Sequence, residues 1–531
     1  MATPEVLKFT FDSIENGVVS TFYEQTAGTY SNGIGIDPDS SVDGGTSNPK
    51  KSGFITPVAY QKFSSSISGK TMAIMTNPKN EKVYTMNTGG ALWSYSNTLG
   101  SETSVGTCAG TVCGGAAYYN NYLYFMGTGA SANDVSRYGP LDGSPSLTNG
   151  VWTGATLGSQ TALGSTITQV PRQMRLPGHW GYVHSDGALY FCDYTNGQGL
   201  INKIKTTKGT AEGDTNDGSA YNVLDLPFGY FPTCITSYGT DLVISAIQGQ
   251  STVLNQGKSA LFFWDTFSDS FYNKVDISDP LLTCVFNNNN VLYAFAGNST
   301  SGFRVLQYLG GKSMQSLYYF EDGMSPYPGA VDSFGDRLSF GSFTTYPENS
   351  ASVWSIGSKD GRLPKALHNS VRTTSTGANP MVTALKYFGQ ASNITPPLIA
   401  AWSDDSADGI DKPGGTLNAV WRSQVCTTGK KFVIRKITVP FSDVTGSSWS
   451  AVPAIYTDDL KGTIFTLDTI NDTNFPNRRN VIFKNPKMDN SNPVTGSHNF
   501  IFELRYGGST IVGVAPPIEI EVEVYEDEPT R

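Results

Sequence analysis

Short apolar strands joined by polar turns recur along most of this chain. The stretch His184–Cys192 reads HSDGALYFC, in which an Asp-Gly turn leads into an apolar strand that begins at Leu189. Asp-Gly favours a tight hairpin because both central turn positions accept positive φ. Related phrases surround five further leucines, Leu92, Leu123, Leu242, Leu292 and Leu338. The pattern predicts a series of antiparallel hairpins.

The spacing of these leucines indicates the architecture. Successive gaps are 31, 66, 53, 50 and 46 residues. Four short strands at a period of roughly 40–50 residues are typical of β-propeller blades. A single four-stranded sheet cannot bury both faces, whereas radial stacking covers them. A weaker seventh unit spans 380–415, so residues 54–415 are predicted to form a seven-bladed propeller. Six or eight blades also fit, because the longest gap can hide an insertion, and a tandem of irregular β-sandwiches is the alternative fold.

The two ends of the chain have different patterns. Ile518–Val524 alternates apolar residues with Glu, which predicts a strand with one buried face. With the strand candidates at 421–441, 462–468, 480–484 and 499–506, it predicts a separate β-sandwich-type domain over residues 416–531. Residues 1–53 hold one alternating segment, 7–11, that can pair with a distant strand, and then a Gly/Ser/Asp-rich arm or loop expected to be flexible. The expected fold class is therefore all-β, a propeller followed by a C-terminal sandwich.

Composition and charge narrow the classes of function. With 36 Lys and Arg against 45 Asp and Glu, the formal charge of -9 argues against a general nucleic-acid binder, which needs clustered cations. No apolar stretch approaches the ~20 residues that cross a membrane. The first ten residues lack the basic region and apolar core of a secretory signal. We therefore expect no membrane insertion and no cleavable export signal.

A search for catalytic chemistry finds no HExxH, GxSxG or P-loop sequence. The spacing of the four histidines fits no standard metal site, and we expect neither catalytic residues nor a cofactor or metal. A propeller glycosidase would need paired carboxylates. The candidates are expected to be turn residues that bond the local backbone. They are Asp186, Asp193, Asp241, Asp265, Asp332 and Asp336, while His179, His184, His368 and His498 are the histidines.

Two smaller groups of residues, one of carboxylates and one of cysteines, each allow two interpretations. The acidic run at 404–411 could hold a hard cation, but it lacks the ordered ligand pattern of an EF-hand, so a solvated acidic loop is expected. Its carboxylates are Asp404, Asp405, Asp408 and Asp411. Cys108 and Cys113 could form a local disulfide. Cys192, Cys234 and Cys284 lie in apolar strand patterns and are predicted to be buried free thiols.

The last domain carries opposite charges on separate strands. The long strand is basic and the final strand is acidic. One interpretation is a solvated sheet face whose charges protect against aggregation. The other is complementary contact between neighbouring subunits in a ring or tube. The residues of this predicted subunit interface are Lys430, Lys431, Arg435, Lys436, Glu519, Glu521 and Glu523.

A signal-free, His-poor, Gly/Tyr/Asn-rich propeller runs here into the 421–441 strand pair and a short β domain with an acidic last strand. This combination resembles tailed-bacteriophage virion proteins, in particular propeller-bearing components of tail tubes and tail nozzles. The resemblance lies in architecture and includes no invariant motif. It implies a non-enzymatic structural subunit of the virion, assembled in the host cytoplasm. Its C-terminal domain would join copies of the chain into a ring around the DNA path, with other tail proteins as partners and propellers displayed outward.

Two other classes of function remain open from the sequence. One is a carbohydrate-binding or adhesin-like propeller that recognises a host surface glycan or receptor. The other is a polysaccharide-cleaving propeller enzyme, which would use carboxylates such as Asp186 or Asp193.

Overall fold

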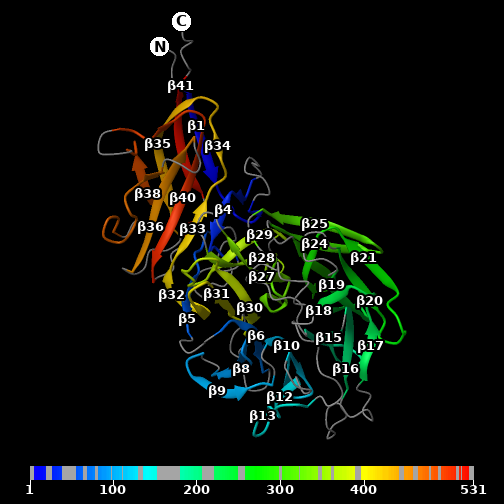
Figure 1. Cartoon of the computed structure of the whole chain (residues 1–531). Coiled ribbons are helices and arrows are strands. Elements are labelled where there is room, and N and C mark those ends of the chain that lie inside the picture. The colour runs from blue at the N-terminus through cyan, green and yellow to red at the C-terminus, as the bar shows by residue number, and fades with distance from the viewer. Residues whose placement is uncertain are drawn as a thin grey trace.

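A computed structural model gives the structure of the chain. It describes residues 5–18, 27–38, 55–63, 69–77, 82–96, 99–109, 112–128, 135–151, 180–195, 197–205, 220–248, 258–297, 302–321, 323, 325–344, 350–359, 361, 364–388, 396–441, 448–458, 464–476, 480–487, 492–509, 513–515 and 517–525. Within these residues the regular structure consists of strands and one 3-10 turn, η4 (Pro328–Ala330). The predicted all-β class, a propeller joined to a C-terminal β-sandwich, is confirmed (Figure 1).

The propeller contains seven four-stranded antiparallel sheets among the described residues. The first three blades are β6 (Thr71–Thr76), β7 (Val83–Asn87), β8 (Ala91–Tyr95), β9 (Glu102–Thr107); β10 (Val112–Tyr119), β11 (Tyr122–Thr128), β12 (Val135–Gly139), β13 (Ser146–Thr148); β14 (Gly181–Val183), β15 (Leu189–Thr195), β16 (Gln198–Ile204), β17 (Ala220–Asp225). The next two are β18 (Tyr230–Tyr238), β19 (Asp241–Gln248), β20 (Ser259–Trp264), β21 (Asn273–Ile277); β22 (Leu281–Asn288), β23 (Val291–Gly297), β24 (Phe303–Gly310), β25 (Ser313–Phe320). The last two are β26 (Val331–Phe334), β27 (Arg337–Thr344), β28 (Ser350–Ile356), β29 (Leu367–Arg372); β30 (Met381–Tyr387), β31 (Leu398–Ser403), β32 (Asp408–Leu417), β5 (Ala59–Lys62).

The innermost strands share a device that joins neighbouring blades. The pairing register shifts at a β-bulge in β6, β10, β18, β22 and β30. A bulge increases the local twist and frees one residue from the ladder. In β18 that residue is Thr233, whose hydroxyl donates to the Leu282 carbonyl of the next blade at 2.7 Å. Thr233, which the bulge leaves unpaired in its own sheet, therefore forms a hydrogen bond to the next sheet.

The seventh blade is closed by a strand from the other end of the propeller. Its outer strand is β5, which pairs with β32 through partners such as Asp411 and Lys62. The buried Tyr60 hydroxyl donates to the Leu398 carbonyl at 3.0 Å. Because the outer strand comes from before the first blade, the ring is held shut by backbone hydrogen bonds.

The sandwich consists of two sheets that enclose a core of apolar side chains. We call them the β35 sheet and the β40 sheet. The β35 sheet is ordered β1 (Glu5–Phe11), β41 (Ile518–Tyr525), β35 (Lys431–Pro440), β38 (Asn480–Lys484), with β39 (Thr495–Gly496) on β35. The β40 sheet is ordered β37 (Ile464–Thr466), β36 (Trp449–Thr457), β40 (Asn499–Gly508), β33 (Ala419–Arg422), β4 (Asn32–Ile34), with β34 (Cys426–Thr427) on β40. The parallel pair β2 (Gly17–Val18) and β3 (Thr29–Tyr30) lies between them and the propeller.

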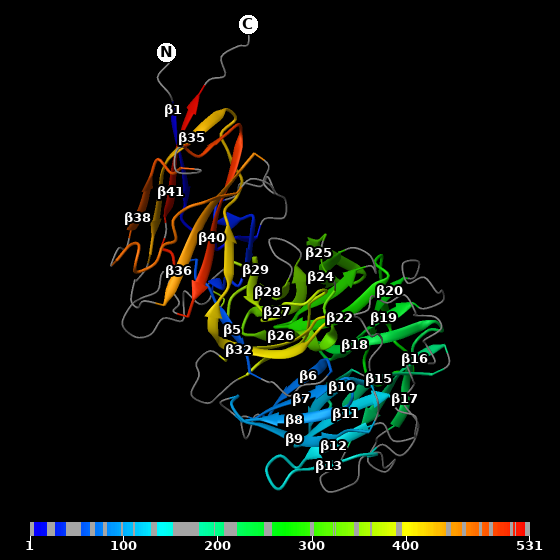
Figure 2. The ribbon, with the colours of Figure 1, turned by 60° about the vertical axis from the view of Figure 1, so that its left-hand side comes forward.

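Both ends of the chain enter the sandwich. The alternating segment at 7–11 lies in β1, which pairs with β41 from Glu5 opposite Val524 to Phe11 opposite Ile518. The apolar residues of β41 are buried and its glutamates are not, as the period-two pattern predicts. The first and last described residues therefore lie side by side, at the end of the sandwich away from the propeller (Figures 1 and 2).

Buried polar contacts hold the sandwich against the sixth blade. Arg337 begins β27, and its Nη1 lies 2.7 Å from Asp37 Oδ1, with the arginine side chain only 2% exposed. Beside this pair the Tyr30 hydroxyl and His368 Nδ1 lie 3.1 Å apart. Burial first, and then the Arg337 charge, lower the pKa of His368 to about 3. The junction between the sandwich and the sixth blade is therefore buried well enough that the His368 imidazole is neutral near pH 7.

Candidate functional site

The hairpin His184–Cys192 acts as a packing unit between the third and fourth blades. His184 Nε2 lies 2.9 Å from the Thr240 carbonyl, in the turn of the next blade. Its Nδ1 lies 3.2 Å from Asp186, which also accepts the Tyr190 hydroxyl at 2.7 Å. Burial opposes ionisation of Asp186, but the hydrogen bonds from Tyr190 and the backbone outweigh it and lower the pKa of the carboxyl. His184 and Asp186, the two residues of this hairpin considered for chemistry, are both held by structural bonds.

The other candidate carboxylates are also held by nearby donors. Asp193 accepts Asn202 Nδ2 at 2.9 Å, Asp241 accepts the Tyr272 hydroxyl at 2.5 Å, and Asp336 accepts Asn289 Nδ2 at 2.7 Å. Asp265 accepts the Ser268 hydroxyl at 2.6 Å within its own turn. Asp332 is different, because it faces the central channel described below.

The acidic run at 404–411 spreads its carboxylates over separate partners. Asp404 accepts backbone N–H groups from Gly377, Ser406 and Ala407, and these bonds outweigh burial and lower its pKa to about 2. Asp411 points into the blade, where Trp402 Nε1 donates to it at 2.9 Å and burial raises its pKa. Within the described ranges no group of three or more metal-ligating side chains occurs.

The cysteines behave as the strand patterns predict where the structure describes them. Cys192, Cys234 and Cys284 are buried free thiols. Cys234 and Cys284 stand on neighbouring innermost strands with their sulfurs 3.9 Å apart. His179 and the Cys113 side chain lie outside the described residues, so the suggested Cys108–Cys113 disulfide stays a prediction.

Opposite charges in the predicted subunit interface meet within one chain. β35 and β41 are adjacent strands, so their side chains form cross-strand pairs. Lys436 Nζ lies 2.9 Å from Glu521, Arg435 pairs with Glu523, and Lys8 of β1 lies 2.6 Å from Glu519. Hydrogen bonding to Glu521 raises the pKa of Lys436, and bonding to Arg435 lowers the pKa of Glu523. This ladder accounts for the charge complementarity without a second subunit.

Lys431 is the first residue of β35 and Lys430 directly precedes it, and neither takes part in the three ion pairs of the ladder. Linear sequence placed the basic and acidic residues about ninety positions apart and could not show that their strands are neighbours. The alternation in Ile518–Val524 was the available signal that the glutamates share one sheet face.

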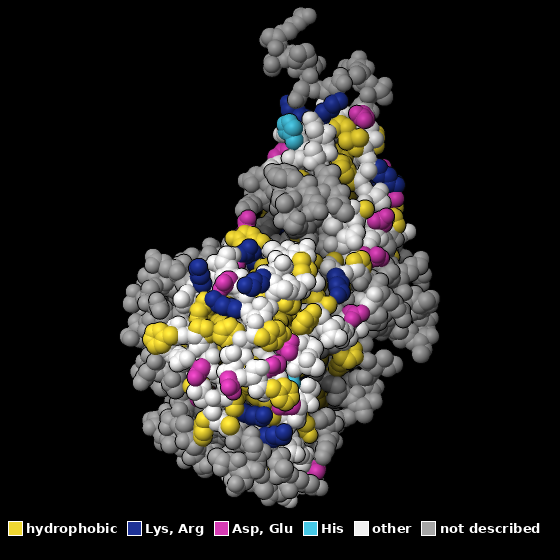
Figure 3. Space-filling model, turned by 90° about the vertical axis from the view of Figure 1, so that its right-hand side faces the viewer, with side chains coloured by type: hydrophobic (Ala, Val, Ile, Leu, Met, Phe, Trp, Pro, Cys, Tyr) yellow, Lys and Arg dark blue, Asp and Glu magenta, His cyan; other side chains and the backbone are white. Residues whose placement is uncertain are grey.

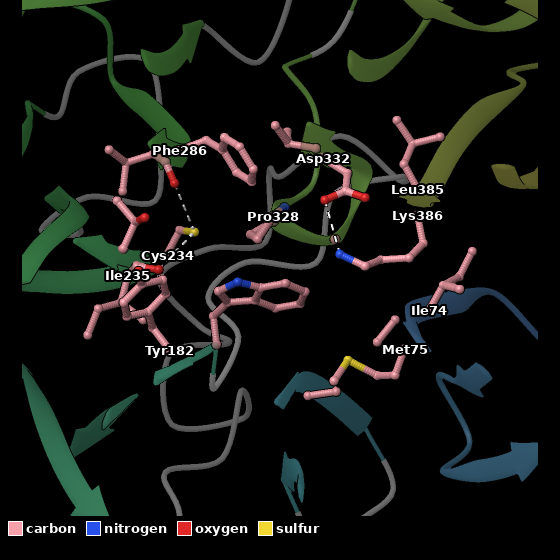
Figure 4. A pocket seen from close by; sticks show the side chains of 17 residues that line it. Ile74, Met75, Tyr182, Cys234, Ile235, Phe286, Pro328, Asp332, Leu385 and Lys386 are labelled. Carbon is pink, nitrogen blue, oxygen red and sulfur yellow. Dashed lines mark hydrogen bonds and ion pairs between the residues drawn. The ribbon is translucent and has the colours of Figure 1, made fainter. Parts of the chain in front are cut away.

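The central channel holds a cavity that the sequence did not reveal. Its volume is about 190 Å³, and every blade contributes to its wall (Figure 4). Apolar side chains form most of the wall, including Met75, Ile235, Phe286 and Leu385. The 3-10 turn brings Gly329 against Met72 and Trp180, so that a Cβ on Gly329 would lie 2.4 Å from the Met72 carbonyl oxygen. Glycine is therefore needed where three blades meet at the axis.

One ion pair lies in this mostly apolar wall. Asp332 Oδ1 lies 3.0 Å from Lys386 Nζ, and the two side chains come from the sixth and seventh blades. Asp332 Oδ2 accepts the Tyr387 backbone N–H at 2.7 Å. Figure 4 shows this pair with Cys234, Ile235 and Tyr182 on the opposite side. Sequence reasoning named Asp332 as a carboxylate candidate but could not supply its partner.

The outer surface of the propeller carries no large field of one charge on the flank shown in Figure 3, where acidic, basic and hydrophobic side chains are interspersed. Several large apolar side chains on the blades are nevertheless exposed, namely Phe228, Phe267, Tyr272, Leu309 and Tyr319. No helix in the described part of the chain has the length and apolar character needed to cross a membrane.

Comparisons with known proteins give no family and only distant structural likenesses. No protein-family model matches the sequence, and no curated protein matches it. The β-propeller domain of Cps50 (Swd1) from Myceliophteria thermophila is similar over 67% of this chain and 99% of that chain, with 10% identity and a TM-score of 0.39. A putative 6-phosphogluconolactonase from Bacteroides uniformis is similar over 62% of this chain and 93% of that chain, with 14% identity and a TM-score of 0.39.

Proposed function

We propose that this chain is a non-enzymatic structural subunit that assembles through its sandwich into a ring or tube and displays its propeller outward. The resemblance of its sequence architecture to tailed-bacteriophage tail proteins suggests the virion as the setting. One observation carries the proposal. The β35 sheet ends in two edge strands, β1 and β38, whose directions and side chains suit pairing between copies.

Strand direction is the first part of this reasoning. Each neighbouring pair in the order β1, β41, β35, β38 is antiparallel, so β1 and β38 run in opposite directions. When copies are related by rotation about an axis along the strands, β38 of one copy meets β1 of the next as an antiparallel pair. In the described part of the chain neither strand pairs with anything on its outer side. Such edges are templates for pairing with another chain.

The side chains of the two edges match when Phe9 stands opposite Val481. Leu7 then faces Phe483, so that these two half-buried residues cover each other, while the half-buried Phe9 packs over the buried Val481. On the solvent side Lys8 faces Ile482, which is 43% exposed, and its methylene stem can cover that residue. A shift by two residues would put Lys8 opposite Lys484, and like charges directly opposite are destabilising. The charge ladder of β35 and β41 would then lie on one face of a continuous sheet.

A non-enzymatic role is consistent with the state of the candidate carboxylates. Outside the channel each is already held by a hydrogen-bond donor of its own or a neighbouring blade. A glycosidase would instead need two carboxyl groups facing a substrate across about 5–10 Å.

Cross-linking of two variants that each carry one added cysteine tests the assembly. Lys8→Cys and Ile482→Cys are purified separately, mixed, oxidised gently and run on a non-reducing gel. We expect a covalent dimer from this mixture. Ile464→Cys is the matched control, since Ile464 is 46% exposed on an edge strand of the other sheet and should give no dimer with Lys8→Cys. The wild-type chain reports any contribution of the native thiols.

The setting needs a separate measurement. Mass spectrometry of purified phage particles should find the chain, and electron microscopy of the purified protein should show a closed ring or a tube. A chain that stays strictly monomeric at high concentration, and that is absent from particles, would contradict the proposal.

A further inference from the structure

We propose that the cavity in the central channel is a binding site for a single neutral sugar ring or a polyol of similar size. This inference concerns the propeller alone and does not depend on assembly through the sandwich. It rests on the size of the cavity, on its unpaired polar groups and on its zero net charge.

Size limits the ligand to a small one. Drug-sized ligands occupy pockets of ~300 Å³ or more. The channel cavity, at about 190 Å³, is smaller. At ~30 Å³ for each liquid water, it holds about six water molecules. A single sugar ring therefore fits the available space, whereas a longer chain of sugars would have to extend beyond the cavity.

Two residues of the wall carry a polar side-chain group that has no hydrogen-bond partner among the described residues. These groups are the Trp180 indole N–H and the Thr236 hydroxyl. Neither is enclosed away from solvent, since neither is among the buried polar atoms left unsatisfied. An indole N–H can only donate, while a hydroxyl can donate and accept. A ligand with several hydroxyl groups satisfies both.

Charge balance favours a neutral ligand. Among the described residues of the cavity wall, Asp332 and Lys386 are the charged ones, and they neutralise each other. A charged ligand would have to compete with this ion pair at a distance of 3.0 Å. A hydroxyl group can instead donate to the carboxylate and accept from the ammonium without separating them.

The remaining wall supplies apolar contact. Trp180, Tyr182 and Phe286 present aromatic surface, and the Tyr182 hydroxyl is already bonded to Ser237 at 2.7 Å. A mostly apolar wall with a few placed polar groups is the usual composition of a small-molecule site. The C–H face of a sugar ring would lie on the aromatic surface while its hydroxyls reach the polar groups.

Saturation-transfer NMR of the full chain tests the site. The probes are the methyl glycosides of glucose, galactose and mannose, with glucuronate and glucosamine as charged analogues. At least one neutral glycoside should show transfer, with a Kd near ~1 mM for a ligand of this size. The charged analogues should bind more weakly.

Two variants and one control place the binding in the channel. Trp180→Phe removes the donor and keeps the ring, and Lys386→Met removes the ammonium; each should weaken binding about tenfold. Lys274→Met is the matched control, because Lys274 also pairs with an aspartate, Asp276 at 2.7 Å, but on the outermost strand of the fourth blade. It should leave binding unchanged. Lys386→Met is the second test if Trp180→Phe fails to fold.

Three results would overturn the proposal. They are the absence of transfer from every neutral glycoside, equal binding by the wild type and both folded channel variants, and stronger binding of the charged analogues. These results would leave the cross-linking of the sandwich edges unaffected, so the two proposals fail separately.

Discussion

A buried carboxylate in the sandwich gives the sharpest test of its energetics. Glu503 on β40 is fully buried, and Arg422 Nε of the neighbouring β33 lies 2.5 Å from it. Arg505 also pairs with Glu503, and the Tyr456 hydroxyl donates to it at 3.1 Å. One carboxylate thus balances two guanidinium groups. The Glu503→Gln variant keeps the shape of the side chain, removes the charge and turns an amide N–H toward donors.

The expected cost follows from burial. Removing one partner of a buried ion pair leaves an uncompensated charge, at about 3–5 kcal/mol. At a urea slope of ~2 kcal/mol per M, the midpoint should fall by about 2 M. Glu523→Gln is the matched control, because Glu523 also pairs with an arginine across adjacent strands, but that arginine side chain is 40% exposed. Exposed ion pairs contribute little, so the midpoint of this variant should barely move.

The assay is urea unfolding followed by tryptophan fluorescence. Trp421 and Trp449 belong to the sandwich core and report its transition. The β40 sheet is intact in both variants if their spectra in buffer match the wild type. Equal midpoint shifts for Glu503→Gln and Glu523→Gln would refute the reasoning, because burial would then make no difference to the two pairs.

Two further predictions concern the propeller and its junction. His368 has a pKa of about 3 when folded and ~6.5 when unfolded, so the unfolded chain takes up a proton between these values. The free energy of unfolding should therefore fall as pH drops from ~6.5 to ~3, by at most ~1.4 kcal/mol per pH unit. His368→Gln should reduce this pH dependence when denaturation is measured across that range. An unchanged pH dependence in the variant would contradict the assignment to His368. Two hairpin glycines with positive φ differ in their surroundings. A Cβ on Gly335 would lie 1.9 Å from the Lys359 carbonyl oxygen, whereas a Cβ on Gly239 would meet nothing within 4 Å. Gly335→Ala should therefore lower the melting temperature more than Gly239→Ala, because the Gly239 variant costs only the backbone strain of ~1 kcal/mol. Equal shifts of the melting temperature would show that the loop at Lys359 moves to relieve the contact.

Local patterns predicted much of this fold, because they depend on residues close in sequence. The Asp-Gly turn before Leu189 and the alternation in Ile518–Val524 each set a local conformation, and the structure has a hairpin and a half-buried strand there. The Leu spacing then predicted repeated four-stranded units. No comparable local signal marked Ala59–Lys62 as the outer strand of the last blade. Its partner lies some 350 positions later in the chain.

The candidate site likewise combines features that local sequence predicted with features that only the fold brought together. The hydrogen bonds of Asp186 were expected, because turn aspartates bond their own backbone. The opposite charges of β35 and β41 were visible in the sequence, but their pairing within one sheet was not. The channel cavity could not be predicted at all, since Trp180, Asp332 and Lys386 come from three blades and meet only after the ring closes.

By itself, the sequence determined the strands, the turns and the buried faces, because periodicity and turn chemistry act over a few residues. Tertiary structure alone decided which distant strands pair, which charges neutralise each other and where the channel leaves a cavity. The physical reason is that a strand's two edges offer the same backbone hydrogen bonds to any partner. The choice among partners is made by the packing of the whole chain, which no local stretch records.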